Sequence, residues 1–449
     1  MKLPLTLTRY QAVAWMSFIL LIIWSIPHTI ALRYSLMSAS LLCCLSVASV
    51  RQALWTQLRH SRTLWLYLLL SLWLLIQVPT VALHPGETLE ELRGQWLKSS
   101  LALLLGMAVM YLGRHQASSG RAQVLNGVFV ALGCAVLIQA LDYLWAWGVY
   151  GESPFNSTGV FNGKVQVSYL ANLFLLLCMA EAFSRLSGGG RYFQVPSLLL
   201  AGWALLAAAV TFFSGARNGL IGLVLLCMST GLLVLYYAPA SIRRSHRMGG
   251  FVALLLLAGT LTGLHLKTDS RWARFVESTA YSFHTDTVLS WLDAKRYPYP
   301  ILSDGQPLDD SAYERTAWII VGMKLSAEHP LGVGFTRKAY SNAVMEKYGV
   351  AVRHSHSGLV EYTLGMGWPG MALWGAFLLA VFAQGLRRLL KHHDTLALTS
   401  MFLISGFAGR MVIENITRDH MMEMFMFLIG LVLAALMRDR QPTPGTPAT

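Results

Sequence analysis

Charged residues are scarce in this chain. Only 13% of its 449 residues are Asp, Glu, Lys or Arg, and 55% are hydrophobic. A soluble domain typically carries about 25% charged residues, so the shortage excludes an ordinary soluble fold. Acidic residues are the scarcer kind, with 22 Asp and Glu against 35 Lys and Arg, which leaves a formal net charge of +13.

Cysteine and metal-binding patterns are also sparse. Five cysteines lie inside apolar runs and form no Cys-x-x-Cys pair: Cys43, Cys44, Cys134, Cys178 and Cys227. Neither a disulfide framework nor a cysteine metal site is therefore expected. The chain has no Asp-x-Asp pair and no internal repeat, and its only low-complexity tract is the Pro/Thr tail at 441–449. We predict that this tail is disordered.

Long apolar runs are what the chain does have. A transmembrane helix needs about 20 predominantly apolar residues. Twelve runs qualify, centred near residues 13–30, 35–50, 64–83, 97–112, 124–147, 167–184, 195–213, 219–237, 249–265, 368–386, 395–413 and 421–437. The first lacks a small-residue cleavage pattern after it, so we expect a retained helix rather than a signal peptide. The pattern predicts an all-α polytopic membrane protein with about 12 transmembrane helices.

The runs divide the chain into four parts. We expect helices one to nine in 1–266, a large loop at 267–355, a re-entrant half-helix followed by helices ten to twelve in 356–440, and the tail. Helical spacing of apolar residues from Ser311 to Glu328, followed by Pro330, predicts a helix inside the loop. Residues 286–295 and 337–348 are further helix candidates.

Lys and Arg segregate between the connections. With a cytoplasmic N-terminus, the inward segments hold seventeen, namely Lys2, Arg9, Arg51, Arg59, Arg62, Arg114, Arg121, Arg185, Arg191, Arg243, Arg244, Arg247, Arg387, Arg388, Lys391, Arg438 and Arg440. The short outward connections hold seven, namely Arg33, Arg93, Lys98, Lys164, Arg217, Arg410 and Arg418. This bias predicts that both termini are cytoplasmic and the loop is outside. Anionic membrane lipids attract such basic segments, so the net charge requires no nucleic-acid partner.

A polar segment precedes the tenth run. His356, Leu359 or Val360, Thr363, Gly367 and Gly370 fall at helical spacing, which predicts a half-helix entering from outside with His356 in its first turn. Ser355 or Ser357 can cap this helix, and Pro369 predicts a break before the span at 368. The glycines would let a neighbouring helix approach closely. A lone histidine more often holds a loop to the headgroups, so His356 becomes a candidate only through its neighbours.

Three arginines fall in outward segments. Arg217 ends a tight turn where it can snorkel to the headgroups, Arg315 lies on the loop helix beside Glu314, and Arg410 can pair with Glu414. Together they suit an anionic diphosphate, because guanidinium binds phosphate oxygens bidentately. His354 and His356 suggest a metal, but residues two apart do not share a helix face and no carboxylate completes a ligand set. We therefore expect no metal and no cofactor.

The segment resembles a known signature. His356-Ser357, nine intervening residues and then Gly367-Trp368-Pro369-Gly370 is similar to the His-Asn/Ser-x9-Gly-x-x-Gly signature of bacterial O-antigen ligases, within the O-antigen ligase/polymerase family. Ser214-Gly215-Ala216-Arg217 resembles the family's Ser-Arg-Gly element, with Ala216 and Asn218 replacing commoner residues. Arg315-x-x-Trp318 leading to His329-Pro330-Leu331-Gly332 matches as well. The matching segments cover roughly residues 205–385.

The resemblance implies a membrane-embedded glycosyltransferase of the GT-C type. Such an enzyme moves O-antigen polysaccharide from undecaprenyl diphosphate onto a sugar hydroxyl of lipid A-core, on the periplasmic face of the bacterial inner membrane. It implies His356 as general base and Arg217, Arg315 and Arg410 as diphosphate binders. We expect a supporting role for Ser357, Glu361, Gly367, Gly370 and His354.

Other functions remain open at this stage. An O-antigen polymerase would use a second lipid-linked glycan as acceptor, and a protein O-oligosaccharyltransferase would use a serine of a protein. A flippase or transporter for lipid-linked glycans would carry ionisable residues at the bilayer midplane. The central thirds of the predicted spans carry almost none.

The charge segregation gives a topology prediction. A reporter fused at Arg243 should be cytoplasmic, and one fused near Asp304 should be periplasmic. Paired alkaline phosphatase and fluorescent-protein fusions would measure this. The opposite pattern would place the polar segment in the wrong compartment.

Overall fold

The computed structural model describes residues 5–116, 119–151, 153–161, 163–239, 242–269, 271–303 and 305–436. Over these residues every regular element is helical, and the one β feature is an isolated bridge between Ile301 and Pro307. The all-α polytopic membrane fold predicted from the apolar runs is confirmed. The tail predicted to be disordered and the reporter position Asp304 lie outside the described residues.

The helices follow the apolar runs closely. Their bounds in chain order are α1(Leu5–Ile23), α2(Ile30–Leu45), α3(Ala48–His60), α4(Arg62–Thr80), α5(Pro85–Glu91), the π-helical turn η1(Leu92–Trp96), α6(Leu97–Gln116), α7(Gly120–Tyr150), the 3₁₀ turn η2(Gly159–Phe161), α8(Lys164–Leu186), α9(Ser197–Phe213), α10(Arg217–Tyr237), α11(Arg244–Thr268), α12(Arg271–Tyr281), α13(Asp310–Glu328), α14(Ala339–Tyr348), α15(Gly358–His392), α16(Thr395–Ile413) and α17(Asp419–Leu436).

The number of membrane spans is smaller than the number of apolar runs. Within the described chain, 8 helices are long and apolar enough to cross a membrane, or 9 if the pair α2 and α3, bent by 95°, counts as one span. Three further apolar helices, Arg9–Ile23, Ser197–Phe213 and His420–Leu436, are only 10–17 residues long. Each predicted run therefore has its helix, and the count of about twelve spans remains a prediction.

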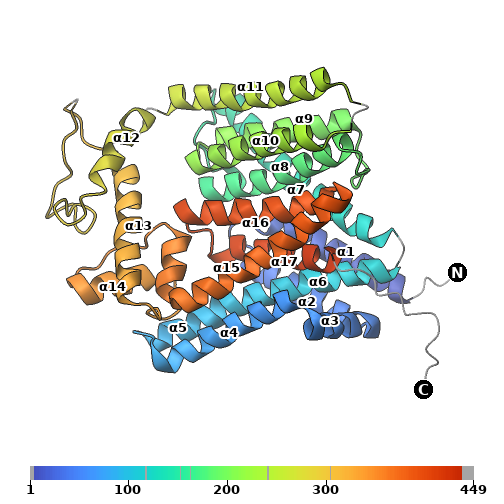
Figure 1. The fold of residues 1–449 in the computed structure, drawn as a ribbon, viewed down its shortest axis with the longest axis horizontal. Helices are drawn as coiled ribbons and strands as arrows, with labels where there is room; N and C mark the ends of the chain where they lie inside the picture. The colour runs from blue at the N-terminus through green and yellow to red at the C-terminus, as the bar shows by residue number, and fades with distance from the viewer. Residues whose placement is uncertain are drawn as a thin grey trace.

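The long helices lie side by side, and α12, α13 and α14 gather at one end of the bundle (Figure 1). Helix α17 is the centre of the packing, because its side chains from Met422 to Ala435 are almost all buried. It approaches α6 very closely: a Cβ added at Gly106 would lie 2.0 Å from the carbonyl oxygen of Phe427, and one at Gly430 would lie 2.1 Å from that of Leu103. Small residues at such contacts allow membrane helices to pack backbone against backbone.

The loop between α11 and α15 is partly helical, as predicted. Helix α13 confirms the prediction for 311–328, and α14 confirms the candidate at 337–348. The candidate at 286–295 is wrong, because this segment forms turns. There the side chain of Asp293 accepts hydrogen bonds from the backbone N–H groups of Lys295 and Arg296, an alternative to helical bonding that Asp offers readily. Helix α12 was not predicted.

Helix α15 is broken at Gly367, two residues before Pro369, as the proline predicts. Gly367 has φ 66° and ψ 176°, a conformation open almost only to glycine. Helix α4 holds this break: the indole of Trp73 donates to the carbonyl oxygen of Met366 at 2.7 Å, and the amide of Gln77 donates to that of Leu331 at 2.8 Å. The Met366 acceptor at the break is thereby satisfied within the protein, and Leu331 is held against Gly367.

The break gives a stability prediction. Gly367→Ala should destabilise the fold by about 2 kcal/mol or more, since it adds strain of order 1–3 kcal/mol and a Cβ that would lie 2.3 Å from the Leu331 carbonyl carbon. Gly375→Ala is the matched control, because Gly375 lies in the same helix with nothing within 4 Å of its added Cβ. Thermal unfolding in detergent would compare them. Equal melting temperatures for the two variants would contradict the role given to Gly367.

Candidate functional site

His356 lies in the connection between α14 and α15, two residues before α15 begins. The prediction that it occupies the first helical turn is therefore wrong, and it shares no helix face with Gly367 or Gly370. Its φ is +56°, an uncommon conformation for a residue other than glycine. The helix begins after Ser357 instead, whose hydroxyl caps it by accepting a hydrogen bond from the Val360 N–H at 3.3 Å.

Glu361 holds the histidine connection in place. Its carboxylate is only 3% exposed and accepts hydrogen bonds from the Ser355 N–H at 2.9 Å, the Ser355 hydroxyl at 3.1 Å and the Tyr340 N–H at 3.2 Å. The guanidinium of Arg418 lies 3.7 Å away. A buried carboxylate is tolerated only with such partners, and these bonds fix the backbone at Ser355, the residue before His356.

The environment of His356 is aromatic and cationic. Its ring stacks on Trp318 with 5.6 Å between centroids and 14° between planes, and the His354 ring lies 4.1 Å away. Burial, together with the nearby His354, Arg315, Arg418 and Arg353, lowers the pKa of His356 to about 4. The pKa of His354 is lowered to about 4 for the same main reason. At neutral pH both rings are uncharged, so His356 can accept a proton.

The two imidazoles are not part of a recognisable metal site. Across the described residues, no group of three or more His, Cys, Asp and Glu side chains is arranged to hold a metal ion. A catalytic zinc usually needs three protein ligands.

Arg315 lies on α13 and reaches the end of α16. Its guanidinium donates to the Glu414 carboxylate at 2.5 Å, with side-chain exposures of 39% and 8%. The sequence suggested other partners, Glu314 for Arg315 and Glu414 for Arg410. Glu314 instead accepts a hydrogen bond from the Tyr299 hydroxyl. Arg315 remains accessible and also lies close enough to lower the pKa of His356.

Arg217 is held by two carboxylates that the sequence did not single out. Its guanidinium lies 2.8 Å from Asp309, the N-cap of α13, and 3.4 Å from Asp269, the C-cap of α11. Arg271 pairs with Asp269 as well, at 2.6 Å. These two arginines and two carboxylates balance in charge. Arg217 therefore contacts the N-cap of α13, the helix that carries Arg315. Asp309 and Arg315 are six residues apart, about 9 Å of helical rise.

Arg410 is buried, at 7% exposure. It donates to the Ser168 hydroxyl at 3.1 Å and to the Val165 carbonyl oxygen at 3.4 Å, and its guanidinium lies 5.8 Å from the centre of the Tyr169 ring. No carboxylate of the described chain lies within ion-pair distance of it. Glu414, one turn further along, pairs with Arg315 instead.

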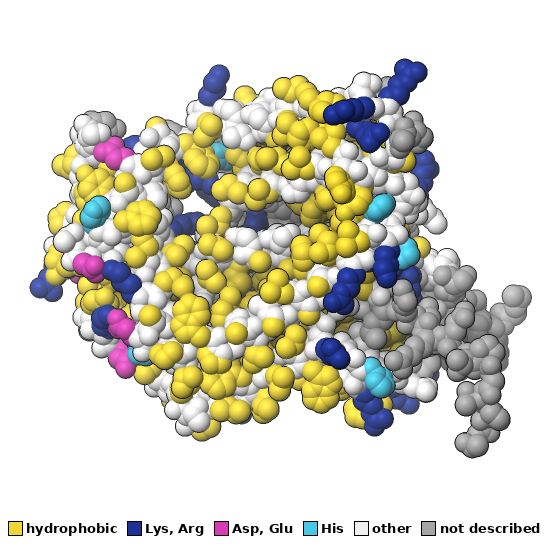
Figure 2. All heavy atoms as spheres, in the orientation of Figure 1, with side chains coloured by type: hydrophobic (Ala, Val, Ile, Leu, Met, Phe, Trp, Pro, Cys, Tyr) yellow, Lys and Arg dark blue, Asp and Glu magenta, His cyan; other side chains and the backbone are white. Residues whose placement is uncertain are grey.

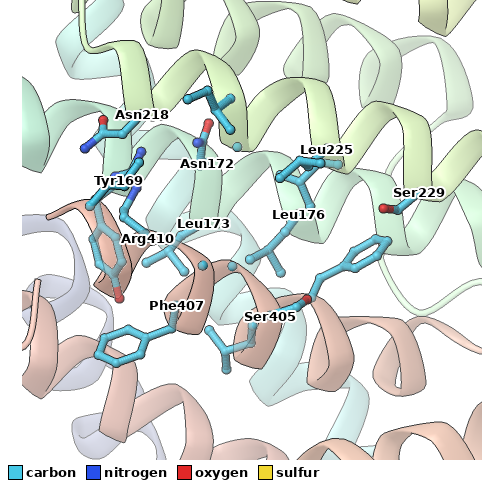
Figure 3. A pocket seen from close by; sticks show the side chains of 18 residues that line it. Tyr169, Asn172, Leu173, Leu176, Asn218, Leu225, Ser229, Ser405, Phe407 and Arg410 are labelled. Carbon is cyan, nitrogen blue, oxygen red and sulfur yellow. The ribbon is translucent and has the colours of Figure 1, made fainter. Parts of the chain in front are cut away.

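Arg410 lines one end of a cavity of about 270 Å³ between α8, α10 and α16 (Figure 3). Asn218 lies at the same end, buried to 8% exposure, and neither its amide oxygen nor its amide nitrogen has a hydrogen-bond partner. Further along, the lining is mainly hydrocarbon, including Leu176, Leu225 and Leu403. A polar end joined to an apolar body is suited to an anionic group that carries a lipid chain.

The structure thus gathers His354, His356, Ser357, Glu361 and Arg315 in one cluster. Gly367 and Gly370 are not part of it, because an added Cβ would meet Leu331 at the first and Met366 and Trp73 at the second. Their support is structural, at the helix break. The sequence did not indicate that Asp269, Asp309 and Arg418 contact the predicted site residues. Asn218 was noted only because it replaces a commoner residue, and its place in the cavity was not predicted.

Residues 202–375 match the O-antigen ligase family. The matched segment contains Arg217, Arg315, His356 and the helix break, and ends before Arg410. No curated protein matches the chain. The match supports a glycan-transferring activity of the O-antigen ligase or polymerase type. This multi-pass membrane protein therefore carries an O-antigen ligase family domain over residues 202–375.

Proposed function

We propose that the protein is an O-antigen ligase of the GT-C type. It transfers O-antigen polysaccharide from undecaprenyl diphosphate to a sugar hydroxyl of lipid A-core, on the periplasmic face of the bacterial inner membrane. The observation that carries the proposal is the position of the His356 imidazole, which stacks on Trp318 and lies close to Arg315, Arg353 and Arg418. A proton acceptor close to cations is suited to attack on a diphosphate-linked sugar.

The reaction can be written with these groups alone. His356 takes the proton of the acceptor hydroxyl while its oxygen bonds to the anomeric carbon of the donor sugar. The bond from that carbon to the diphosphate oxygen breaks, and undecaprenyl diphosphate leaves with the electron pair. Attack opposite the leaving group inverts the anomeric centre. The arginines stabilise the negative charge that develops on the leaving group, a role that a metal ion fills in other enzymes.

Arg315 is the best placed diphosphate ligand. Its side chain is 39% exposed and its partner Glu414 is a single carboxylate, which a diphosphate can displace. A bound diphosphate would also neutralise nearby positive charge and so raise the pKa of His356 toward the operating pH. A general base works best when its pKa is close to that pH.

In this proposal, Arg410 and Arg217 also bind the donor, near the start of its isoprenoid chain. Arg410 and Asn218 face the cavity end where an isoprenoid chain would begin, and the apolar lining beyond them suits that chain. Asp269 and Asp309 hold the guanidinium of Arg217, the residue that precedes Asn218 in the chain. A ligase, a polymerase and a protein O-oligosaccharyltransferase would share this donor site and differ in the acceptor.

The low pKa of His356 predicts the pH profile. His356 must be uncharged to act as base, so activity is present above its pKa and is lost as pH falls through it. We expect kcat/KM, which reports the free enzyme, to be level from pH 8 to about pH 5 and to fall tenfold per pH unit below about 4. The acid limb of kcat should lie at higher pH, because bound donor is anionic. Full recovery of activity after return to pH 7 is the control. An acid limb of kcat/KM near pH 6.5 would contradict the lowered pKa of His356.

Separate roles for His356 and Arg217 can be measured with substitutions. His356→Ala should lower single-turnover transfer by about 10²–10⁴-fold with near-normal donor binding. Arg217→Ala should weaken donor binding, because it leaves Asp269 and Asp309 with one arginine between them, and Arg217→Lys should not restore a bidentate contact. Arg274→Ala is the control on neighbouring α12, where Arg274 only donates to the Pro307 carbonyl oxygen. A fully active His356→Ala enzyme would rule out the proposed base.

Transfer should survive EDTA. The arginines take the electrostatic role, and the acidic groups nearest to them, Asp269, Asp309 and Glu414, are each engaged with arginine. The assay is initial transfer rate with and without chelator, with a metal-dependent glycosyltransferase as the positive control. Loss of activity that magnesium or manganese restores would show that a carboxylate site had been overlooked.

A further inference from the structure

A second cavity lies between α8, α9, α10 and α11, away from the histidine site. Its volume is about 500 Å³, and its lining is almost entirely hydrocarbon, including Leu200, Ala204, Phe251 and Leu254. Helix α11 closes it loosely: only 11% of its apolar window is buried, compared with 89% for α8. Helix α11 therefore leaves most of its side chains exposed while it lines one wall of the cavity.

The cavity belongs to the opposite end of the bundle from His356. Helix α10 starts at Arg217 in the candidate site and ends at Tyr237, a helix of 21 residues with a rise of about 30 Å. Helix α11 starts at that far end with Arg244 and returns to Asp269 beside Arg217. Because the hydrocarbon core of a bilayer is also about 30 Å thick, the mouth near Arg247 lies at the other membrane surface.

Arg247 lines this mouth with an unbalanced charge. Its Nε donates to the Ile242 carbonyl oxygen and its Nη1 to that of Ala238, both at 3.0 Å. In the described residues no carboxylate pairs with it. Arg185 also lines the cavity, but Glu181 neutralises it at 2.8 Å. Arg243 and Arg244 are exposed next to the mouth.

The surrounding surface is basic. On the face shown in Figure 2, Lys and Arg side chains line the right-hand end of the molecule and the acidic side chains gather at the left. Basic pockets between helices at one membrane surface are typical sites for anionic lipid headgroups. Inside the cavity, the Thr230 hydroxyl is 2% exposed and has no hydrogen-bond partner, so a polar atom of an occupant can meet it.

We propose that this cavity binds an anionic glycerophospholipid, with its phosphate at Arg247 and an acyl chain between α9 and α11. Water does not suit a site with so apolar a lining. The diphosphate of an undecaprenyl donor belongs at the other membrane surface, some 30 Å away. The inference does not depend on the proposed transfer reaction, since none of these residues belongs to the histidine site.

Native mass spectrometry of the detergent-purified full chain tests this with phosphatidylglycerol and phosphatidylcholine of identical acyl chains. Wild-type protein should retain phosphatidylglycerol about fivefold more tightly, the effect expected of one arginine near a headgroup with a net negative charge, since choline offsets the phosphate of phosphatidylcholine. Arg247→Gln should lower phosphatidylglycerol binding to the phosphatidylcholine level. Ala204→Phe, which fills the cavity without changing charge, should abolish retention of both lipids.

Arg387→Gln is the matched control, because Arg387 is exposed at the same end on α15 and does not line the cavity. It should bind like wild type. If Arg247→Gln does not fold, Ala204→Phe decides the question alone. Equal binding of the two lipids, undiminished retention by Ala204→Phe, or displacement of phosphatidylglycerol by equimolar undecaprenyl phosphate would each overturn the proposal.

Discussion

The buried carboxylate of Glu361 is the contact on which the candidate site depends. It joins three segments: the histidine connection through Ser355, the start of α14 through Tyr340, and the residue before α17 through Arg418. Burying a carboxylate costs several kcal/mol unless hydrogen bonds compensate. The same partners that offset this cost also fix His356 in its unusual backbone conformation. The imidazole proposed as general base is thus positioned by hydrogen bonds between other residues.

Two of the proposed donor-binding arginines are paired with carboxylates before any substrate binds. Arg217 lies between Asp309 and Asp269, and Arg315 faces Glu414. Such pairing keeps each guanidinium oriented and lets a diphosphate exchange for a carboxylate rather than enter an empty cationic pocket. In the proposed reaction the product is also a diphosphate, undecaprenyl diphosphate. Carboxylates that return to the arginines would aid its release.

Local sequence patterns predicted the elements well and the long-range pairs poorly. The length of the apolar runs located the membrane helices, and helical spacing with Pro330 located α13. Pro369 located the break in α15, because a proline lacks a backbone donor and acts locally. The sharp bend between α2 and α3 and the short helix α12 were not predicted, since tertiary contacts decide them. The resemblance pointed to His356 and Arg315, which lie together. Asp309 and Glu414 could not be assigned as partners, because those pairs span 92 and 99 residues.

The acceptor is the most direct test of the proposed function. Wild-type protein in proteoliposomes would receive one defined undecaprenyl diphosphate glycan and, in separate reactions, purified lipid A-core, a second lipid-linked glycan or a pilin-like protein. Mass spectrometry would identify the product, and NMR would give the configuration of the new glycosidic bond. We expect transfer to lipid A-core only, with inversion at the anomeric carbon. Transfer only to the lipid-linked glycan or to the protein would contradict the assignment as a ligase.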